Sequence, residues 1–393
     1  MKILLVFGTR PEAIKMAPVV RELRRRAEAG ELEYRVCCTA QHREMLDQVL
    51  DIFGIVPDYD LRVMEANQTP TAVASAVLRD LEPVLRAERP DWVLVQGDTT
   101  TVAAASLAAF YARARVGHVE AGLRTHDRWQ PFPEEINRRV AGVIADLHFA
   151  PTRSAAGNLL REGTDPAAVV VTGNPVVDAL QWVAGDDTLR GTDEGMRAAD
   201  EVLAELGDRR LVLVTAHRRE NFGAPLEEIC HALADLAREH GDSIRIVYPV
   251  HLNPNVSEPV RRLLGGVPGV RLLPPVDYVP FVRLLKHAYL ALTDSGGIQE
   301  EAPGVGVPVL VMRDTTERPE AVEAGTARLV GARRATIVRE VNALLSDPGL
   351  RERMTDVVNP YGDGRAAERI VAAVLGEPVD EFVAGPALSE ALA

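Results

Sequence analysis

The strongest constraint on the fold is a regular alternation of short apolar runs with segments of helical period. It begins with the run Ile3–Phe7 and a helix expected from about Pro11, and it continues through Tyr34–Cys38 and Trp92–Val95. Each run is apolar throughout rather than at every second position, which is typical of strands that are covered on both faces. The alternation therefore predicts an α/β protein built on a doubly wound parallel sheet.

The alternation is interrupted once and then restarts. Residues 185–195 (GDDTLRGTDEG) lose their apolar side chains and fill with charge and glycine, which indicates a linker. The further expected strands are Val116–Val119, Leu147–Ala150, Val169–Thr172, Leu211–Thr215, Ile244–Tyr248, Val270–Leu273, Leu290–Thr293 and Val307–Met312.

The chain has 393 residues, and a typical domain has roughly 150. We therefore expect two domains, residues 1–184 and 185–364, with a C-terminal helix at about 365–380 that packs back on the first domain. The last residues, from about Gly376, are weakly patterned and predict a frayed tail. Ligands of such sheets bind beyond the carboxyl ends of the strands, so we expect the functional site in a central cleft between the domains.

Charge and composition exclude several classes of function. The formal net charge is -13, and the basic run Arg24–Arg26 lies in a helix-like segment as a solvated face, so nucleic acid is not an expected partner. Cys37 and Cys38 lie in an apolar run, where small buried residues are expected, and nothing resembles a disulfide framework or a metal site. Because no apolar stretch is long enough for a signal or a membrane span, we expect a cytoplasmic protein.

The turn after the first expected strand is a candidate anion site. It reads Gly8-Thr9-Arg10-Pro11-Glu12, with Lys15 one helical turn further on. Proline suits the first turn of a helix, and two cations near a helix N-terminus favour a bound phosphate. The same spacing also fits an ordinary strand-to-helix turn with two solvated cations, and residue spacing alone leaves both interpretations open.

A similar turn follows the expected strand Leu290–Thr293. There Ser295, Gly296 and Gly297 precede a helix-like segment that contains Glu301. Small residues let backbone amides approach a pyrophosphate closely, and the dipole of the following helix adds to the attraction. Many strand-to-helix turns carry glycine for steric reasons, so this pattern by itself also leaves both interpretations open.

Three carboxylates occupy similar positions after strands of the first expected domain. They are Asp98 in QGDTTT, Glu120 in HVEAGLRT and Glu134 in PFPEEINR. Loops at the ends of parallel strands converge, and crowded carboxylates supply a general acid beside a general base. The alternative is that Asp98 and Glu134 only stabilise the N-termini of the helices that follow them.

Two histidines follow strands of the second expected domain. His217 lies in VTAHRREN and His251 lies in YPVHLNPN. A histidine at such a position can orient a phosphate or transfer protons near neutral pH. A histidine there is also compatible with a purely structural role.

Taken together, these segments resemble a known enzyme family. GTRPEAIKMAP, TAQHREMLDQVL, GDTTT, GHVEAGLRT, PFPEEINR, TAHRREN, YPVHLNPN, LTDSGGIQEEAP, RDTTERPEA and NPYGDG are similar to segments of the bacterial non-hydrolysing UDP-N-acetylglucosamine (UDP-GlcNAc) 2-epimerases. The likeness runs from about Met1 to Gly364 and weakens in the linker and the tail. The resemblance implies a GT-B fold, two Rossmann-like domains with the nucleotide sugar in the cleft, and the interconversion of UDP-GlcNAc and UDP-N-acetylmannosamine (UDP-ManNAc).

The resemblance also implies site residues, partners and a pathway. The implied catalytic residues are Asp98, Glu120, Glu134 and His217. The implied UDP-binding residues are Arg10, Lys15, Ser295, Gly296, Gly297, Glu301 and Arg318. A second, allosteric UDP-GlcNAc site would involve Gln41, Arg218 and His251. No cofactor or metal is implied, the usual partner is a second copy of the chain in a homodimer, and the product feeds cell-envelope polysaccharide biosynthesis.

The implied chemistry is an elimination of UDP to 2-acetamidoglucal followed by re-addition of UDP. The C2 hydrogen is not acidic in the intact sugar, so the bond from C1 to UDP must stretch first. Arg10, Lys15 and the amides of Ser295–Gly297 suit the charge that develops on the diphosphate. We expect Asp98 and Glu134 to act closest to C2, as base and acid, while Glu120 and His217 position the sugar and UDP.

Four alternative functions remain open from the sequence. A glycosyltransferase shares the fold and the UDP site, and a non-catalytic sensor would bind UDP-GlcNAc without turnover. An epimerase of a UDP-2,3-diacetamido uronic acid would keep the chemistry and change the sugar. A hydrolysing epimerase would release free N-acetylmannosamine and UDP.

Overall fold

The computed structural model describes residues 1–39, 43–63 and 68–384. The chain divides into two compact units. The N-terminal unit contains Met1–Ala179 and Tyr361–Val383, and the C-terminal unit contains Leu180–Pro360. Helix α7 (Pro175–Gly185) leads from one unit into the other.

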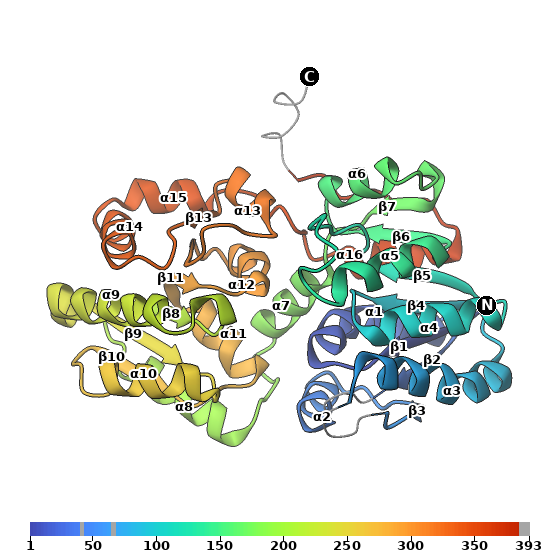
Figure 1. Cartoon of the computed structure of the whole chain (residues 1–393), viewed down its shortest axis with the longest axis horizontal. Coiled ribbons are helices and arrows are strands. Elements are labelled where there is room, and N and C mark those ends of the chain that lie inside the picture. The colour runs from blue at the N-terminus through green and yellow to red at the C-terminus, as the bar shows by residue number, and fades with distance from the viewer. Residues whose placement is uncertain (40–42, 64–67, 385–393) are drawn as a thin grey trace. The chain divides into compact units, whose positions relative to one another are not determined.

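The N-terminal unit is built on a parallel sheet (Figure 1). Among the described residues the sheet has seven strands in the order β3-β2-β1-β4-β5-β6-β7. The strands are β1 (Lys2–Phe7), β2 (Glu33–Cys38), β3 (Tyr59–Asp60), β4 (Trp92–Gln96), β5 (Arg115–Val119), β6 (Leu147–Ala150) and β7 (Val169–Val171). The order reverses between β1 and β4, which is the topological switch point of a doubly wound sheet.

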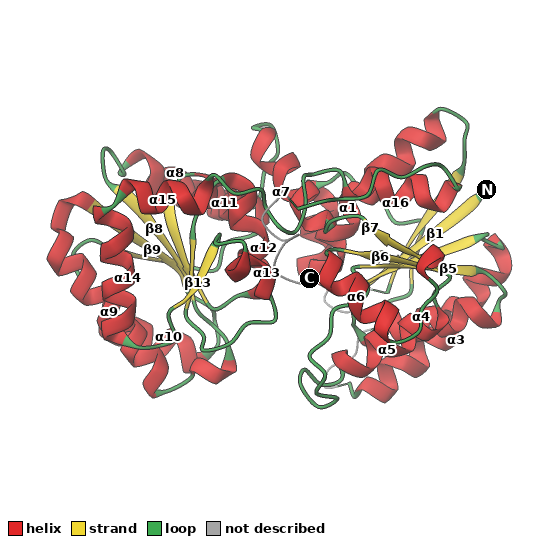
Figure 2. Cartoon of the chain, turned by 90° about the horizontal axis from the view of Figure 1, so that it is seen from above, coloured by secondary structure: helices red, strands yellow, loops and turns green. Residues whose placement is uncertain are grey.

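Helices cover both faces of this sheet. They are α1 (Arg10–Glu28), α2 (Arg43–Ile52), α3 (Pro70–Glu88), α4 (Thr100–Tyr111), α5 (Glu134–Ile144), α6 (Arg153–Arg161) and α16 (Ala366–Leu375), with the short 3-10 helix η1 (Pro166–Ala168). Figure 2 shows α1 and α16 on one face and α3, α4 and α5 on the other. Leu4 and Val6 of β1 pack in the core that α3 and α4 cover, while Ile3 and Leu5, which alternate with them, are also fully buried.

The C-terminal unit repeats the same design. Among the described residues its parallel sheet has six strands in the order β10-β9-β8-β11-β12-β13. The strands are β8 (Arg210–Thr215), β9 (Ile244–Pro249), β10 (Val270–Leu273), β11 (Ala288–Thr293), β12 (Val309–Val311) and β13 (Ala327–Leu329). The switch point here lies between β8 and β11. The predicted fold class, a GT-B pair of Rossmann-like parallel sheets, is confirmed.

Helices again lie on both faces of the sheet of the C-terminal unit. They are α8 (Asp193–Ala204), α9 (Ala224–His240), α10 (Pro254–Leu264), α11 (Tyr278–Lys286), α12 (Gly296–Glu301), α13 (Pro319–Glu323), α14 (Arg334–Ser346) and α15 (Pro348–Thr355), with the 3-10 helices η2 (Arg219–Asn221), η3 (Gly241–Ser243) and η4 (Ala302–Val305). Figure 2 shows α8 and α11 on one face and α9, α10 and α14 on the other.

The predicted linker at residues 185–195 is partly helical. Helix α8 begins at Asp193, and the Thr192 side chain accepts a hydrogen bond from the Gly195 amide, which caps the helix. The Asp277 carboxylate accepts a hydrogen bond from the Thr192 amide at 2.5 Å. The charged residues and glycines of this segment thus form both a connection and the capped start of a helix. Composition alone does not distinguish these two structures.

The chain returns to the N-terminal unit near its C-terminal end. Helix α16, drawn in red in Figure 1, packs on α1. Asp178 of α7 accepts hydrogen bonds from the amides of Ala366 at 3.2 Å and Ala367 at 2.8 Å, and so caps α16. The frayed tail expected from Gly376 is wrong for residues up to 383, because Phe382 is buried and its amide donates to the Val171 carbonyl oxygen.

Two buried histidines make the stability of the N-terminal unit sensitive to acid. His118 and His148 are paired across β5 and β6, and burial lowers the pKa of each to about 4. Histidine in the unfolded chain has a pKa of about 6.5, so the unfolded state binds more protons as the pH falls from 6.5 toward 4. We expect the unfolding free energy to fall through this window, by on the order of 2 kcal/mol per histidine at about pH 5.

Urea unfolding at about pH 7.5 and pH 5 checks this expectation. Burial raises the pKa of Asp178 to about 7, which has the opposite effect because its unfolded state binds fewer protons in this range. The decisive comparison is therefore with a His148→Asn variant, which lacks the ionisable ring and should lose less stability on acidification. Equal losses in the two proteins would contradict the expectation.

A search of the described residues finds no helix that is both long and apolar enough to cross a membrane.

Candidate active site

Several of the predicted site residues lie at the switch points of the two sheets. In the N-terminal unit, Arg10 follows β1 and Asp98 follows β4, the two strands between which the order reverses. In the C-terminal unit, His217 follows β8 and Ser295 follows β11, again the two strands at the reversal. Loops diverge at a switch point and leave room for a ligand beyond the strand ends.

Asp98 is fixed by helix α5. The Arg138 guanidinium donates from Nη2 to Asp98 Oδ2, and the Asn137 side-chain amide donates to the Asp98 backbone oxygen at 3.0 Å. The residue that caps α4 is Thr99, whose side chain accepts from the Val102 amide. Asp98 therefore does not cap this helix, and the capping alternative fails for it.

Glu134 is the first residue of α5. The residue before it, Pro133, makes no side-chain cap, and Glu134 lies in the first turn, where a negative charge favours the helix dipole. Its Oε2 atom is buried and has no hydrogen-bond partner. A shielded carboxylate oxygen without a donor is suited to accepting a proton from a ligand.

Glu120 lies at the end of β5 in a crowded polar environment. Its side chain is almost completely buried, and it accepts hydrogen bonds from Lys15 Nζ at 2.6 and 2.7 Å, from Asn174 Nδ2 at 3.0 Å and from the Gln96 side-chain amide. Its backbone φ is 62°, a left-handed conformation that is strained for a residue with a side chain. Lys15, predicted as a phosphate contact, is thus bonded to Glu120 in this structure.

The turn that carries Arg10 is held by Glu12. Glu12 Oε2 accepts from the amides of Gly8 at 2.8 Å and Thr9 at 2.7 Å, and Oε1 accepts from the Thr99 hydroxyl at 2.6 Å. Glu12 is buried, and burial raises the pKa of its carboxyl against the effect of these bonds. It links the turn after β1 to the turn that carries Asp98. The Thr9 and Glu12 spacing is a capping box, a signal that our sequence analysis did not use.

His217 is fixed by a second residue that our sequence analysis missed. Asp294, fully buried at the end of β11, accepts from the amides of His217 at 2.9 Å and Arg218 at 2.8 Å and from Asn221 Nδ2 at 3.0 Å. His217 Nδ1 lies 3.7 Å from Asp294 Oδ1. Burial lowers the pKa of His217, His251 and Arg218 add to the lowering, and Asp294 opposes it, so the neutral form of the ring is favoured.

Two of the three predicted allosteric residues, His251 and Arg218, lie in the described part of the chain. The His251 ring stacks on that of His217 with 5.6 Å between centroids and 16° between planes. A side-chain atom placed on Gly296 would lie 3.6 Å from Arg218 Nη2, so Arg218 lies beside the Ser295–Gly297 turn. Gln41 lies outside the described residues.

The remaining predicted UDP contacts lie in the C-terminal unit. Ser295 precedes the six-residue helix α12, which begins at Gly296. Glu301 is almost completely buried and accepts from the Tyr278 hydroxyl at 3.4 Å. Arg318 is ion-paired with Glu300. The charge of Arg318 is therefore already balanced by the Glu300 carboxylate. The backbone amides of Ser295–Gly297 lie at the end of β11.

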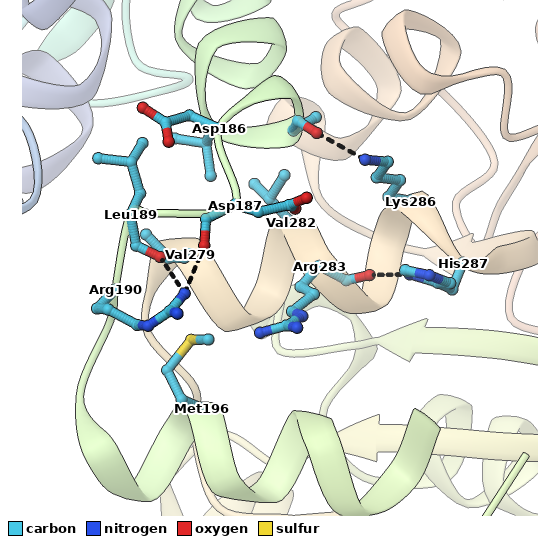
Figure 3. Close-up of a pocket in the computed structure, with 12 residues that line it drawn as sticks. Asp186, Asp187, Leu189, Arg190, Met196, Val279, Val282, Arg283, Lys286 and His287 are labelled. Atoms are coloured by element: carbon cyan, nitrogen blue, oxygen red, sulfur yellow. Dashed lines mark hydrogen bonds between the residues drawn. The ribbon is translucent and has the colours of Figure 1, made fainter. Parts of the chain in front are cut away.

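A separate pocket of about 450 Å³ lies in the C-terminal unit between the end of α7, the connection to α8, and α11 (Figure 3). Its polar groups bond to one another: Lys286 donates to the Ala184 carbonyl oxygen at 2.7 Å, and Arg190 donates to those of Asp187 and Leu189 at 2.6 and 3.3 Å. None of the predicted site residues lines it. Hydrogen bonds around this pocket hold the connection to α8 in place. The pocket is not the candidate active site.

No group of three or more histidine, cysteine, aspartate or glutamate side chains in the described part of the chain has the arrangement of a metal site.

Comparisons with known proteins identify the relatives of the chain. A sequence model of the family described as UDP-N-acetylglucosamine 2-epimerase matches residues 22–375. The UDP-N-acetylglucosamine 2-epimerase of Escherichia coli strain K12 is 56% identical over 382 residues, which cover 95% of this chain and 98% of that protein.

Solved structures agree with the sequence relatives. The UDP-GlcNAc 2-epimerase of Neisseria meningitidis bound to UDP-GlcNAc is 47% identical with a TM-score of 0.86, covering 96% of this chain and 100% of that chain. The S. aureus MnaA-UDP structure is 46% identical with a TM-score of 0.84, covering 97% of this chain and 100% of that chain.

Proposed function

The chain belongs to the UDP-N-acetylglucosamine 2-epimerase family, and from that premise we propose that it interconverts UDP-GlcNAc and UDP-ManNAc without hydrolysis. The observation that carries the proposal is the grouping of Asp98, Glu120 and Glu134 around the ends of β4 and β5 and the start of α5. Several carboxylates beside neighbouring strand ends supply the acid and the base that an inversion at C2 requires.

The proposed reaction begins with cleavage of the C1–O bond. As this bond stretches, UDP takes the electron pair and C1 gains positive character, which makes the C2 hydrogen acidic. A carboxylate removes that proton, and the C2–H electrons form the C1–C2 double bond of 2-acetamidoglucal. UDP then adds back to C1 while a second carboxylic acid gives a proton to the opposite face of C2. The cycle is redox-neutral and requires no cofactor.

Asp98 and Glu134 are the proposed base and acid. Asp98 is bonded through one carboxylate oxygen to Arg138, and Glu134 has an unpartnered oxygen, so each has capacity for a proton. Glu120 is the proposed positioning carboxylate, because Lys15, Gln96 and Asn174 already donate to it. Its ion pair with Lys15 gives this positioning carboxylate a fixed counter-charge.

Stabilisation of the departing UDP is the proposed role of both units. In the N-terminal unit Arg10 stands at the start of α1, and in the C-terminal unit the Ser295–Gly297 amides, Glu301 and Arg318 are the proposed contacts. His217, whose lowered pKa favours the neutral ring and whose backbone amide is held by Asp294, is the proposed donor to a phosphate oxygen or a sugar hydroxyl. Charge that develops on the leaving group is stabilised by several kcal/mol by such fixed donors.

A second UDP-GlcNAc molecule is proposed as an allosteric activator that binds beside the substrate through Gln41, Arg218 and His251. The stacking of His251 on His217 supports this, because a ligand that contacts His251 is then coupled to a proposed catalytic ring. The cytoplasm is the proposed compartment, since nucleotide sugars are made and used there.

Product analysis by NMR tests the proposed function. The wild-type protein incubated with UDP-GlcNAc is expected to give a mixture of UDP-GlcNAc and UDP-ManNAc, and the same mixture is expected from UDP-ManNAc. Free N-acetylmannosamine with one equivalent of UDP would show a hydrolysing epimerase instead. Binding without turnover would favour the sensor, and turnover of a diacetamido uronic acid alone would change the substrate.

The working form is proposed to be a homodimer. Five large apolar side chains on α4 and α5 are exposed, and Val143 is 88% exposed; the others are Phe110, Tyr111, Ile136 and Val140. Light scattering after gel filtration is expected to give about twice the chain mass of 42.7 kDa, and Val143→Asp is expected to shift it to the monomer. Val56→Asp, at an 85% exposed site outside this face, is the control. A monomeric wild-type protein would contradict the proposal.

A further inference from the structure

Arg138 links the two proposed proton-transfer groups. It lies on α5 four residues after Glu134, so both project from one side of the helix. Its guanidinium donates from Nη2 to Asp98 Oδ2 and from Nη1 to Glu135 Oε2 and to the Leu123 carbonyl oxygen, both at 3.3 Å. The helix that carries Glu134 is thereby tied to the loop that carries Asp98.

Glu135 fixes Arg138 in turn. Glu135 is fully buried, and besides Arg138 it accepts hydrogen bonds from the amides of Thr125 at 3.1 Å and His126 at 3.3 Å. A buried ion pair is costly to form unless its remaining polar atoms are satisfied, and removing one partner leaves an uncompensated charge. These amides in the turn after β5 satisfy the carboxylate oxygens of Glu135. The buried ion pair of Glu135 and Arg138 is therefore a stable part of the N-terminal unit.

We propose that Arg138, fixed by Glu135, is a positioning residue that sets the separation of Asp98 and Glu134 and leaves Asp98 Oδ1 for the proton on C2. The inference rests on the proposed function, because it concerns how the two acids of that reaction are placed. A guanidinium holds one carboxylate oxygen in a fixed direction, which a flexible cation does not. Proton transfer at one carbon from two faces depends on such placement, since a displacement of about 1 Å can cost about 100-fold in rate.

Four variants test the inference with UDP-GlcNAc as substrate. Arg138→Met is expected to lower kcat about 100-fold with a KM close to that of the wild type. Arg138→Lys is expected to have a kcat between those of the wild type and Arg138→Met. An ammonium group restores the charge but not the planar arrangement of donors of a guanidinium. Since Arg138 acts through Asp98, the double variant Asp98→Asn with Arg138→Met is expected to be no slower than Asp98→Asn alone.

Arg139→Met is the matched control. Arg139 is the next residue on α5 and pairs with the same Glu135 at 3.4 Å, but no hydrogen bond joins it to Asp98. It is expected to keep wild-type kcat. Circular dichroism and the melting temperature report whether each variant is folded, and Arg138→Lys carries the test if Arg138→Met does not fold.

The outcomes separate the inference from the proposed function. If the wild-type protein does not epimerise UDP-GlcNAc, the proposed function fails. If the wild-type protein does so and a folded Arg138→Met or Arg138→Lys variant keeps the wild-type kcat, the inference fails. It also fails if the double variant is slower than Asp98→Asn by the full factor of Arg138→Met, because Arg138 would then act independently of Asp98.

Discussion

Replacing Asp98 by asparagine is expected to lower kcat for UDP-GlcNAc epimerisation by between about 10²- and 10⁴-fold while the fold stays intact. Asparagine has the same shape and its oxygen can still accept from Arg138, but it takes up no proton. The Asp98 side chain is 31% exposed, so the change removes no buried packing. Coupled measurement of UDP-ManNAc formation gives kcat and KM, and KM is expected to change little.

Asp235→Asn is the matched control for this substitution. Asp235 is also partly exposed, at 23%, and pairs with Arg238 and Arg334 in the C-terminal unit, far along the chain from the proposed acids. It is expected to retain wild-type turnover. An Asp98→Asn protein with more than about a tenth of wild-type kcat would rule Asp98 out as an essential proton carrier.

Replacing Gly122 by alanine is expected to destabilise the N-terminal unit by about 4 kcal/mol or more. Gly122 has a φ of 89°, and a methyl group there would lie 2.2 Å from the Ala155 carbonyl oxygen. The clash with backbone atoms cannot be relieved by a change of rotamer. Because Gly122 follows Glu120 by two residues, the shift would also displace Glu120, so we expect both low stability and loss of turnover.

Gly163→Ala separates the clash from the backbone strain. Gly163 has nearly the same φ, 91°, but no atom lies within 4 Å of the position that a methyl group would take. Its cost is expected to be about 1–2 kcal/mol, from the left-handed backbone alone. Urea unfolding of the two variants gives the comparison, and equal stabilities would show that the contact with Ala155 has no energetic effect.

Much of the fold was predictable because parallel strands buried on both faces leave a simple pattern. Runs such as Leu147–Ala150 and Val270–Leu273 coincide with β6 and β10. The edge strands β3 (Tyr59–Asp60) and β13 (Ala327–Leu329) were not predicted, because they are very short and β13 has a charged residue at its centre. Their length and polarity explain the miss rather than their edge position, because β10 is also an edge strand and was predicted.

The sequence motifs pointed to the three proposed acids of the candidate site but not to the residues that fix them. Asp98, Glu120 and Glu134 stand beside strand ends in recognisable motifs, whereas Asp294 and Glu135 bond to backbone amides that only the fold brings near. Glu134 and Glu135 are neighbours in the sequence. Only the rotation of helix α5 decides that one is fully buried and the other has an unpartnered oxygen.

The claim on which the account depends is that the proton on C2 is removed and replaced during turnover. Incubation of the wild-type protein with UDP-GlcNAc in deuterated water tests it directly, with the products followed by NMR and mass spectrometry. The account predicts that UDP-ManNAc forms with deuterium at C2 and that recovered UDP-GlcNAc gains deuterium at the same carbon. UDP-ManNAc with hydrogen retained at C2 would contradict it.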